Sequence, residues 1–412
     1  MNNYCSRSQL KLLTALALGA LLIGACDAVQ EDIYRGASLA SVGDWNGDGA
    51  EDFAVGEFWR GRVTVLSGLG GGELWGLEGG GDFGWSVCGL EREGEAGQLL
   101  AVGSPESGRV QFFEPLAASP HASFTYEKGA FGWALVGCGD VDGDGLEDVL
   151  VAVPEFEETG NASSRCARVY STGTGEVLAQ SNESERSNLL GFSVAALPGV
   201  RGDAVPDLLV GRGWVPEVKQ YAGRDGALVR GFGKQFGGVP HSYPIVVYGG
   251  EAQPHSILIS NPATLDGGTV FVLDASAVEQ FRIAGSYTGD RFGHSIAVGH
   301  GEPQVLLIGA PGRIKSAGIP LKPVAIRDET PEGARAGFVR LHSAETGEAL
   351  WMFTRDEAGD WLGIASCALG DLDVDGIGDF AVAGQVPGGE QTFVTVLSGK
   401  TGTEIYEAKL PE

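Results

Sequence analysis

A repeated unit runs along most of this 412-residue chain. Each unit usually opens with an aromatic residue or leucine followed by glycine. It continues through one short apolar strand into a second apolar strand. The seven openings, spaced 48, 48, 59, 46, 56 and 70 residues apart, are Arg35-Gly36, Phe83-Gly84, Phe131-Gly132, Leu190-Gly191, Phe236-Gly237, Phe292-Gly293 and Leu362-Gly363. Because such units bury their apolar faces against one another, the repeat constrains the fold more than any local feature does.

The second strand of every unit is apolar on both faces, which is typical of strands buried between two sheets. These strands are Phe53–Gly56, Leu99–Gly103, Val149–Val153, Leu208–Gly211, Ile257–Ser260, Leu306–Gly309 and Phe380–Ala383. A glycine-rich hairpin follows in several units, as in Val169–Gly175 and Leu341–Gly347, and glycine permits the positive φ angles of tight turns.

Four strands in each of seven units predict an all-β fold, a seven-bladed β-propeller of four-stranded blades over residues 33–410. Pairing of the first unit with the last would close the ring and remove exposed edges. A β-sandwich and a β-solenoid are the alternatives, and the 48-residue period with four strands per unit disfavours both.

The first 25 residues are typical of an export signal, with Arg7 and Lys11 before an apolar run from Leu12 to Ala25. Fourteen residues are too few to span a bilayer as a helix, which takes roughly 20. The sequence Leu22-Ile-Gly-Ala-Cys26 resembles the bacterial lipobox, which implies a lipidated Cys26 followed by a short tether over residues 26–32. An ordinary signal peptide with a chance cysteine is the alternative.

The net charge of −26 makes the chain strongly acidic, so nucleic acid and anionic lipid surfaces are disfavoured partners. A membrane contact is therefore expected through the lipid anchor only. The sequence predicts no disulfide framework, because Cys88, Cys138, Cys166 and Cys367 are scattered through the repeats.

Three units carry the pattern D-x-D/N-x-D-G-x-x-D between the first and second strands. Alternating oxygen ligands on a tight loop suit Ca²⁺, whereas Mg²⁺ prefers fewer protein ligands and more water. We therefore predict three calcium sites, with side-chain ligands at positions 1, 3, 5 and 9 and a backbone carbonyl at position 7. The predicted ligands are Asp44, Asn46, Asp48, Ala50 and Asp52; Asp140, Asp142, Asp144, Leu146 and Asp148; and Asp371, Asp373, Asp375, Ile377 and Asp379. An acidic turn without metal is the alternative for any single loop.

The other four units lack this pattern, although the fourth keeps Asp203 and Asp207. There Arg201 could replace a cation, and Arg201-Gly202-Asp203 is read as a chance tripeptide. Two insertions, at 154–165 and 311–337, follow second strands and should emerge on one face. Long loops on a rigid scaffold often carry partner contacts, but a surface insertion without a partner is an equal alternative.

No catalytic motif accompanies these features. The six histidines are scattered, without H-E-x-x-H or G-x-S-x-G patterns, and the glycine-dense segment 68–81 precedes no helix. The sequence therefore predicts no catalytic residues, no organic cofactor and no enzyme. A hydrolase with a site at the propeller axis is the remaining enzymatic alternative.

The Phe-Gly openings, Gly/Ala-Pro strand ends and D-x-D-x-D-G-x-x-D loops together resemble the FG-GAP repeat family, known from integrin α chains. The resemblance covers about residues 33–410 and implies a seven-bladed propeller with calcium in loops of one face and ligands on the opposite face. We expect a calcium-binding propeller on the bacterial envelope, on the periplasmic side of a membrane or at the cell surface. It would bind or adhere to a protein or glycan, with the loops at 154–165 and 311–337 as candidate contacts. A structural role within an envelope complex is the alternative.

Overall fold

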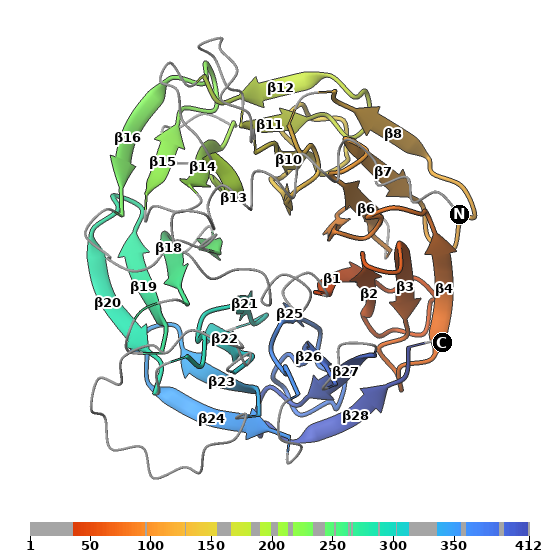
Figure 1. Ribbon diagram of the computed structural model, residues 1–412, viewed down its shortest axis with the longest axis vertical. Helices are drawn as coiled ribbons and strands as arrows, with labels where there is room; N and C mark the ends of the chain where they lie inside the picture. Colours follow the sequence, from red (N-terminus) through yellow and green to blue (C-terminus); the bar gives the residue numbers. More distant parts are fainter. Residues whose placement is uncertain are drawn as a thin grey trace, which may run out of the picture.

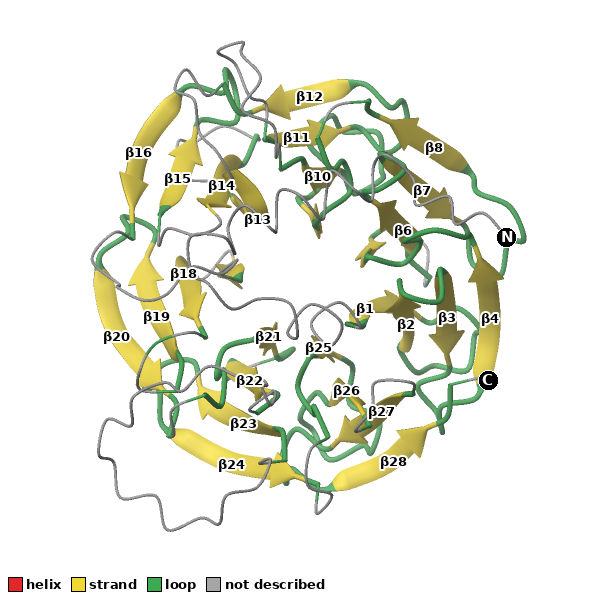
Figure 2. Ribbon diagram, viewed as in Figure 1, coloured by secondary structure: helices red, strands yellow, loops and turns green. Residues whose placement is uncertain are grey.

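Seven four-stranded antiparallel sheets form a ring around a central axis in the computed structural model (Figure 1). The structure describes residues 36–94, 97–127, 129–154, 166–182, 190–198, 205–212, 217–233, 244–250, 253–262, 264, 267–286, 289–301, 303–312, 336–355, 360–386 and 391–410. Across these residues the secondary structure is strand and loop, with no helix (Figure 2). The predicted all-β, seven-bladed propeller is confirmed.

Each blade is one contiguous segment, and its strands pair in chain order from the axis to the rim. The inner strands are β1 (Ser38–Gly43), β5 (Ser86–Leu90), β9 (Leu135–Gly137), β13 (Leu190–Leu197), β17 (Ile245–Gly250), β21 (Ser295–Val298) and β25 (Ala365–Ala368). The second strands are β2 (Asp52–Glu57), β6 (Leu99–Ser104), β10 (Val149–Ala152), β14 (Asp207–Arg212), β18 (Gln253–Asn261), β22 (Val305–Ala310) and β26 (Phe380–Gln385). The third strands are β3 (Arg62–Leu66), β7 (Arg109–Phe113), β11 (Ala167–Tyr170), β15 (Val218–Tyr221), β19 (Thr269–Asp274), β23 (Phe338–Ser343) and β27 (Thr392–Leu397). The outer strands are β4 (Glu73–Glu78), β8 (Ala122–Thr125), β12 (Val177–Gln180), β16 (Leu228–Phe232), β20 (Glu279–Ala284), β24 (Ala349–Thr354) and β28 (Glu404–Ala408).

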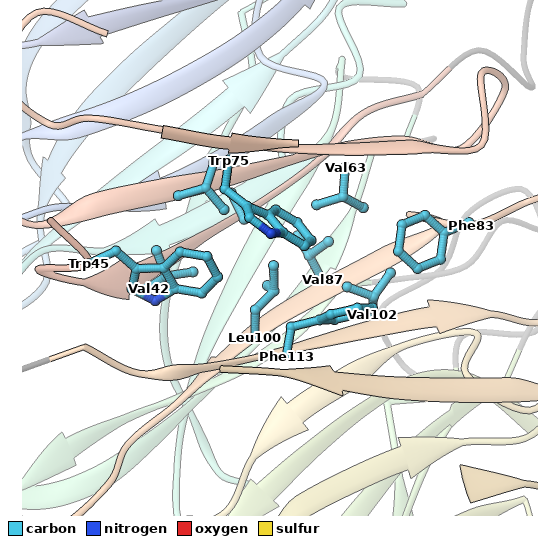
Figure 3. Close-up of a cluster of buried hydrophobic side chains, with 11 residues drawn as sticks. Val42, Trp45, Val63, Trp75, Phe83, Val87, Leu100, Val102 and Phe113 are labelled. Carbon is cyan, nitrogen blue, oxygen red and sulfur yellow. The ribbon is translucent and has the colours of Figure 1, made fainter. Parts of the chain in front are cut away.

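The core lies in the seams between blades. Seven apolar clusters fill the seven seams. Figure 3 shows the seam between the first two blades, where Trp75 of β4 lies over Leu100 and Phe113 of the next blade. Second strands such as β6 are buried along their whole length, because they face a neighbouring sheet on both sides. Outer strands such as β8 alternate between half-buried and exposed residues.

The repeated glycines form the joints between blades. Gly103 in β6 faces the carbonyl oxygen of Gly132, which opens the next blade, and a Cβ at Gly103 would lie 2.3 Å from that oxygen. Gly132 itself has a φ of +89°, a conformation that favours glycine. Ser86 Oγ donates to the same Gly132 carbonyl over 2.8 Å. The joint thus requires the Phe-Gly opening of one unit and the strand-ending glycine of the unit before it.

The ring closes in a different way from the predicted pairing of first and last units. Each sheet is complete in itself, and among the described residues no strand is shared between the first and last blades. At this joint Ala365 and Ala383 occupy the positions of the serine and glycine, and they pack into an apolar cluster with Phe53 and Val55 of β2. Closure therefore depends on side-chain packing and on contacts between loops.

Several predicted features lie outside the described residues. These are the signal sequence 1–25, Cys26 and the tether 26–32, the Arg201–Asp203 tripeptide, the Phe236-Gly237 opening, and residues 155–165 and 313–335 of the two insertions. In the described part of the chain no helix is long and apolar enough to cross a membrane.

Candidate metal centre

The three acidic loops occupy the same place in their blades. Each connects an inner strand to a second strand, β1 to β2, β9 to β10 and β25 to β26, so all three lie on one face of the ring. The β10–β11 and β22–β23 connections, which contain the insertions, begin at the opposite ends of their strands. The insertions and the acidic loops therefore start on opposite faces, as predicted.

The first aspartate of each loop organises the turn. In the third blade Asp140 Oδ1 accepts hydrogen bonds from the amides of Gly143 (2.6 Å) and Asp144 (3.1 Å). Its Oδ2 accepts one from Gly145 (2.9 Å). These backbone amides, chiefly that of Gly145, hold the pKa of Asp140 below its usual value. An ionised carboxylate at position 1 is the form that a cation requires.

Glycine at positions 4 and 6 gives the loop its positive φ angles, +79° at Gly143 and +89° at Gly145. The seventh blade departs from this pattern, because Val374 occupies position 4 with a φ of +60° and is 86% exposed. A β-branched residue is disfavoured in this conformation, so this loop is locally strained.

The last aspartate joins the loop to its own hairpin. Asp148 is buried; its Oδ2 accepts from Val141 N (2.7 Å) and its Oδ1 from Thr172 N (3.2 Å), beyond β11. Asp52 bridges Trp45 N and Gly68 N in the same way, and Asp379 bridges Leu372 N and Gly399 N. Burial raises the pKa of Asp52, Asp148 and Asp379 to about 6. A bound cation would favour their ionised form.

Two of the three loops bring carboxylates together. Asp140, Asp142 and Asp148 each have one oxygen within 4.8 Å of the others, and so do Asp371, Asp373 and Asp375. The first loop shows no such trio and has the amide Asn46 at position 3. Three carboxylates this close repel one another unless a cation or protons neutralise them. These oxygen ligands fit a hard divalent cation.

The predicted backbone ligands lie beside these carboxylates. The amides of Ala50, Leu146 and Ile377 donate to the aspartate at position 5 of their loops, over 2.9, 2.9 and 3.1 Å. Position 7 is thereby held close to position 5. Coordination by the three carbonyl oxygens stays a prediction.

The remaining units use other groups in the equivalent loops. In the second blade the Arg92 guanidinium donates to Gly97 O (3.2 Å) and pairs with Glu114 (2.6 Å). In the fourth blade Asp207 accepts hydrogen bonds from Gln220 Nε2 (2.6 Å) and Gly223 N (3.3 Å). The expected role of Arg201 beside Asp207 lies outside the described residues.

Contacts between the acidic loops and neighbouring blades escaped the sequence prediction. At position 8, Glu147 Oε2 accepts from Glu91 N of the second blade (2.9 Å). The equivalent Glu51 Oε2 accepts from Gly370 N of the seventh blade (3.0 Å). In the sequence, the only sign of these contacts is a glutamate at position 8 in two of the three acidic loops.

A row of aromatic side chains lies on the opposite face and was also not predicted. Phe58 and Trp85 have ring centroids 4.6 Å apart, Trp85 and Trp133 4.6 Å, and Trp133 and Phe192 5.2 Å. These half-buried rings come from the first four blades, just after β2 and just before or at the start of inner strands. The signal was present as an aromatic residue after the opening glycine in three consecutive units, Trp85, Trp133 and Phe192.

His342 and the four cysteines of the repeats lie in surroundings that suit a structural role. His342 is buried, with Nδ1 2.8 Å from Gly347 O and Nε2 accepting from Arg340 Nε at 2.8 Å. Burial lowers its pKa to about 4, so it is neutral at physiological pH. Cys88, Cys138, Cys166 and Cys367 have free thiols, and burial raises the pKa of Cys88 and Cys367 to about 12.

Comparison with known proteins agrees with the repeat and the fold. A family model of the FG-GAP repeat matches residues 131–164, which include the opening of the third blade and its acidic loop. Over 47% of its own length, this chain is 28% identical to integrin alpha-5 of Xenopus laevis. Over 48% of its own length, it is 27% identical to integrin alpha-V of Gallus gallus. It is 26% identical to integrin alpha-PS2 of Drosophila melanogaster over 45%.

The matched region spans only 21%, 22% and 16% of these three relatives, in that order. What the alignments share with this chain is thus a part of each integrin α chain. Together with the seven blades and the repeated Phe-Gly joints, these similarities show an integrin-α-like β-propeller that contains an FG-GAP repeat.

Proposed function

We propose that this chain is a non-enzymatic binding or adhesion module that carries calcium in three loops and recognises a protein or glycan. Its similarity to integrin α chains indicates a role of the binding or adhesion kind. The proposed calcium ligands are the aspartates, Asn46 and position-7 carbonyls of the first, third and seventh blades. Calcium would neutralise the carboxylates there and hold the loops in one conformation.

The observation that carries the binding proposal is the aromatic row of Phe58, Trp85, Trp133 and Phe192. Aromatic side chains are enriched at the centre of protein interfaces. The row lies on the face opposite the acidic loops, where both insertions begin. A partner on this face would leave the calcium loops free for a structural role.

The test is capture of partners from envelope extracts, together with a glycan array, by the full chain. Trp85→Ala with Trp133→Ala, and separately deletion of residues 312–336, should each lower capture several-fold. Leu69→Ala, which changes an exposed hairpin residue on the calcium-loop face, is the matched control and should leave capture unchanged. If all variants captured the same molecules equally, this face would not be the binding surface.

We also propose that the chain is exported and held on the bacterial envelope by lipidated Cys26. The proposal rests on the lipobox-like sequence that ends at this residue. Cys26→Ser should abolish incorporation of labelled fatty acid and move the protein from the membrane to the soluble fraction. Unchanged labelling of this variant would exclude Cys26 as the lipidation site.

A further inference from the structure

The acidic loops of the seventh and first blades are neighbours across the seam that closes the ring. In Figure 1 the last blade, drawn in blue, lies beside the first, drawn in red and orange. Glu51, at position 8 of the first loop, accepts a hydrogen bond from Gly370 N. Gly370 directly precedes Asp371, the first aspartate of the seventh loop. This hydrogen bond links the two loops.

A second link runs through Tyr406 on β28. Its hydroxyl donates to Gly68 O (2.7 Å) and lies 3.2 Å from Ser67 O. Ser67 and Gly68 in turn donate to the first loop, Ser67 Oγ to Asp48 (3.3 Å) and Gly68 N to Asp52 (3.0 Å). Tyr406 therefore holds the hairpin that positions two aspartates of the neighbouring blade.

The seam itself includes part of the seventh loop. Leu372, at position 2, packs with the apolar cluster that contains Phe53 and Val396. It also lies against Gly68, where a Cβ would be 3.2 Å from Leu372 Cδ2. These loop contacts add to the apolar cluster that fills the seam, where Ala365 replaces the joint serine.

We propose that calcium binding to the first and seventh loops is positively coupled, so that the two ions together stabilise the seam that closes the ring. The proposal rests on the calcium binding proposed above. An ion in the first loop fixes Glu51 and the Ser67–Gly68 hairpin, which order Gly370 and Tyr406 of the last blade. The second ion then binds a loop that is already ordered, so the loop loses less conformational entropy when this ion binds. The loop of the third blade instead contacts the second blade's loop, where Glu147 Oε2 accepts from Glu91 N and Gly145 O accepts from Glu93 N. Among the described residues no hydrogen bond joins it directly to the first or the seventh acidic loop, so we expect it to bind its ion independently.

Chains with two sites test the coupling by isothermal titration calorimetry. Asp144→Asn leaves the first and seventh sites, whereas Asp375→Asn leaves the first and third. We expect the second ion to bind the Asp144→Asn chain about fivefold or more tightly than independent sites would allow. The Asp375→Asn chain should bind two ions independently. Equal behaviour of the two chains would overturn the coupling.

Two further variants in the Asp144→Asn chain test the contacts themselves. Glu51→Ala and Tyr406→Phe should each reduce the cooperativity, and the matched change Glu147→Ala should preserve it. Far-UV circular dichroism checks that each variant is folded. Cooperativity that survives both Glu51→Ala and Tyr406→Phe would contradict the proposed route. A wild-type chain that takes up no calcium would overturn the proposed calcium function itself, whereas uptake at independent sites would overturn only the coupling.

Discussion

Removal of calcium with excess EGTA is expected to lower the melting temperature of this protein by several degrees or more. A ligand at about 100 times its Kd stabilises the folded state by about 2.7 kcal/mol per site. Three sites would therefore contribute about 8 kcal/mol, which is comparable to the whole stability of many domains. Without the ion, the carboxylates of Asp140, Asp142 and Asp148 repel one another, because their oxygens lie within 4.8 Å.

The measurement is a thermal melt followed by circular dichroism or calorimetry, in calcium and in EGTA. A triple variant, Asp48→Asn, Asp144→Asn and Asp375→Asn, changes position 5 of all three loops and serves as the control. It should melt at the same temperature in both buffers. An unchanged wild-type melt in EGTA would exclude a structural role for calcium.

Gly103→Ala is expected to destabilise the fold by about 3 kcal/mol or more. The added Cβ would lie 2.3 Å from both Gly132 O and Ser86 Oγ, so the backbone of two adjacent blades would have to separate. The buried hydrogen bond from Ser86 to Gly132 would be lost with it. A single methyl group placed at a joint between blades should therefore be enough to destabilise the fold strongly.

Gly72→Ala is the matched control, because a Cβ at Gly72 meets no atom within 4 Å. Its effect should stay within about 0.5 kcal/mol. Urea unfolding of both variants at saturating calcium separates the joint effect from the metal effect. If Gly103→Ala were as stable as Gly72→Ala, close packing at the joint would not explain the repeated glycine.

The sequence predicted the blades well because their signals are local and repeated. Strands such as Leu306–Gly309 are apolar on both faces, and the structure places β22 at Val305–Ala310 with every residue buried. The hairpins after Val169 and Leu341 also form as predicted. An apolar strand and a glycine turn can each be recognised within one short stretch of sequence.

The acidic loops were predictable for the same reason. The alternation of carboxylates and glycines is a local pattern, and in the third and seventh blades the structure gathers three of the predicted aspartates. In the first blade it does not gather three carboxylates, because position 3 is the amide Asn46. The identity of the ion stays a prediction.

Contacts that join distant segments could not be predicted from one sequence. Glu51 and Gly370 are 319 residues apart, and Tyr406 and Ser67 are 339 apart. The aromatic row arises because equivalent positions of successive blades lie side by side, which only the ring geometry reveals. Local sequence patterns therefore predict the blades and the acidic loops, whereas the contacts in the seams become apparent only in the folded ring.

The contiguity of each blade has a consequence for how the chain reaches this structure. Among the described strands, all pairings join neighbours in the sequence, so each sheet can form with a small loop-closure entropy. Local topologies of this kind favour rapid folding. Only the seam between the seventh and first blades must wait for both ends of the propeller. Docking of this seam is accordingly the step with the highest contact order. A circular permutant that joins residue 410 to residue 36 and opens another seam should shift that late step to the new position.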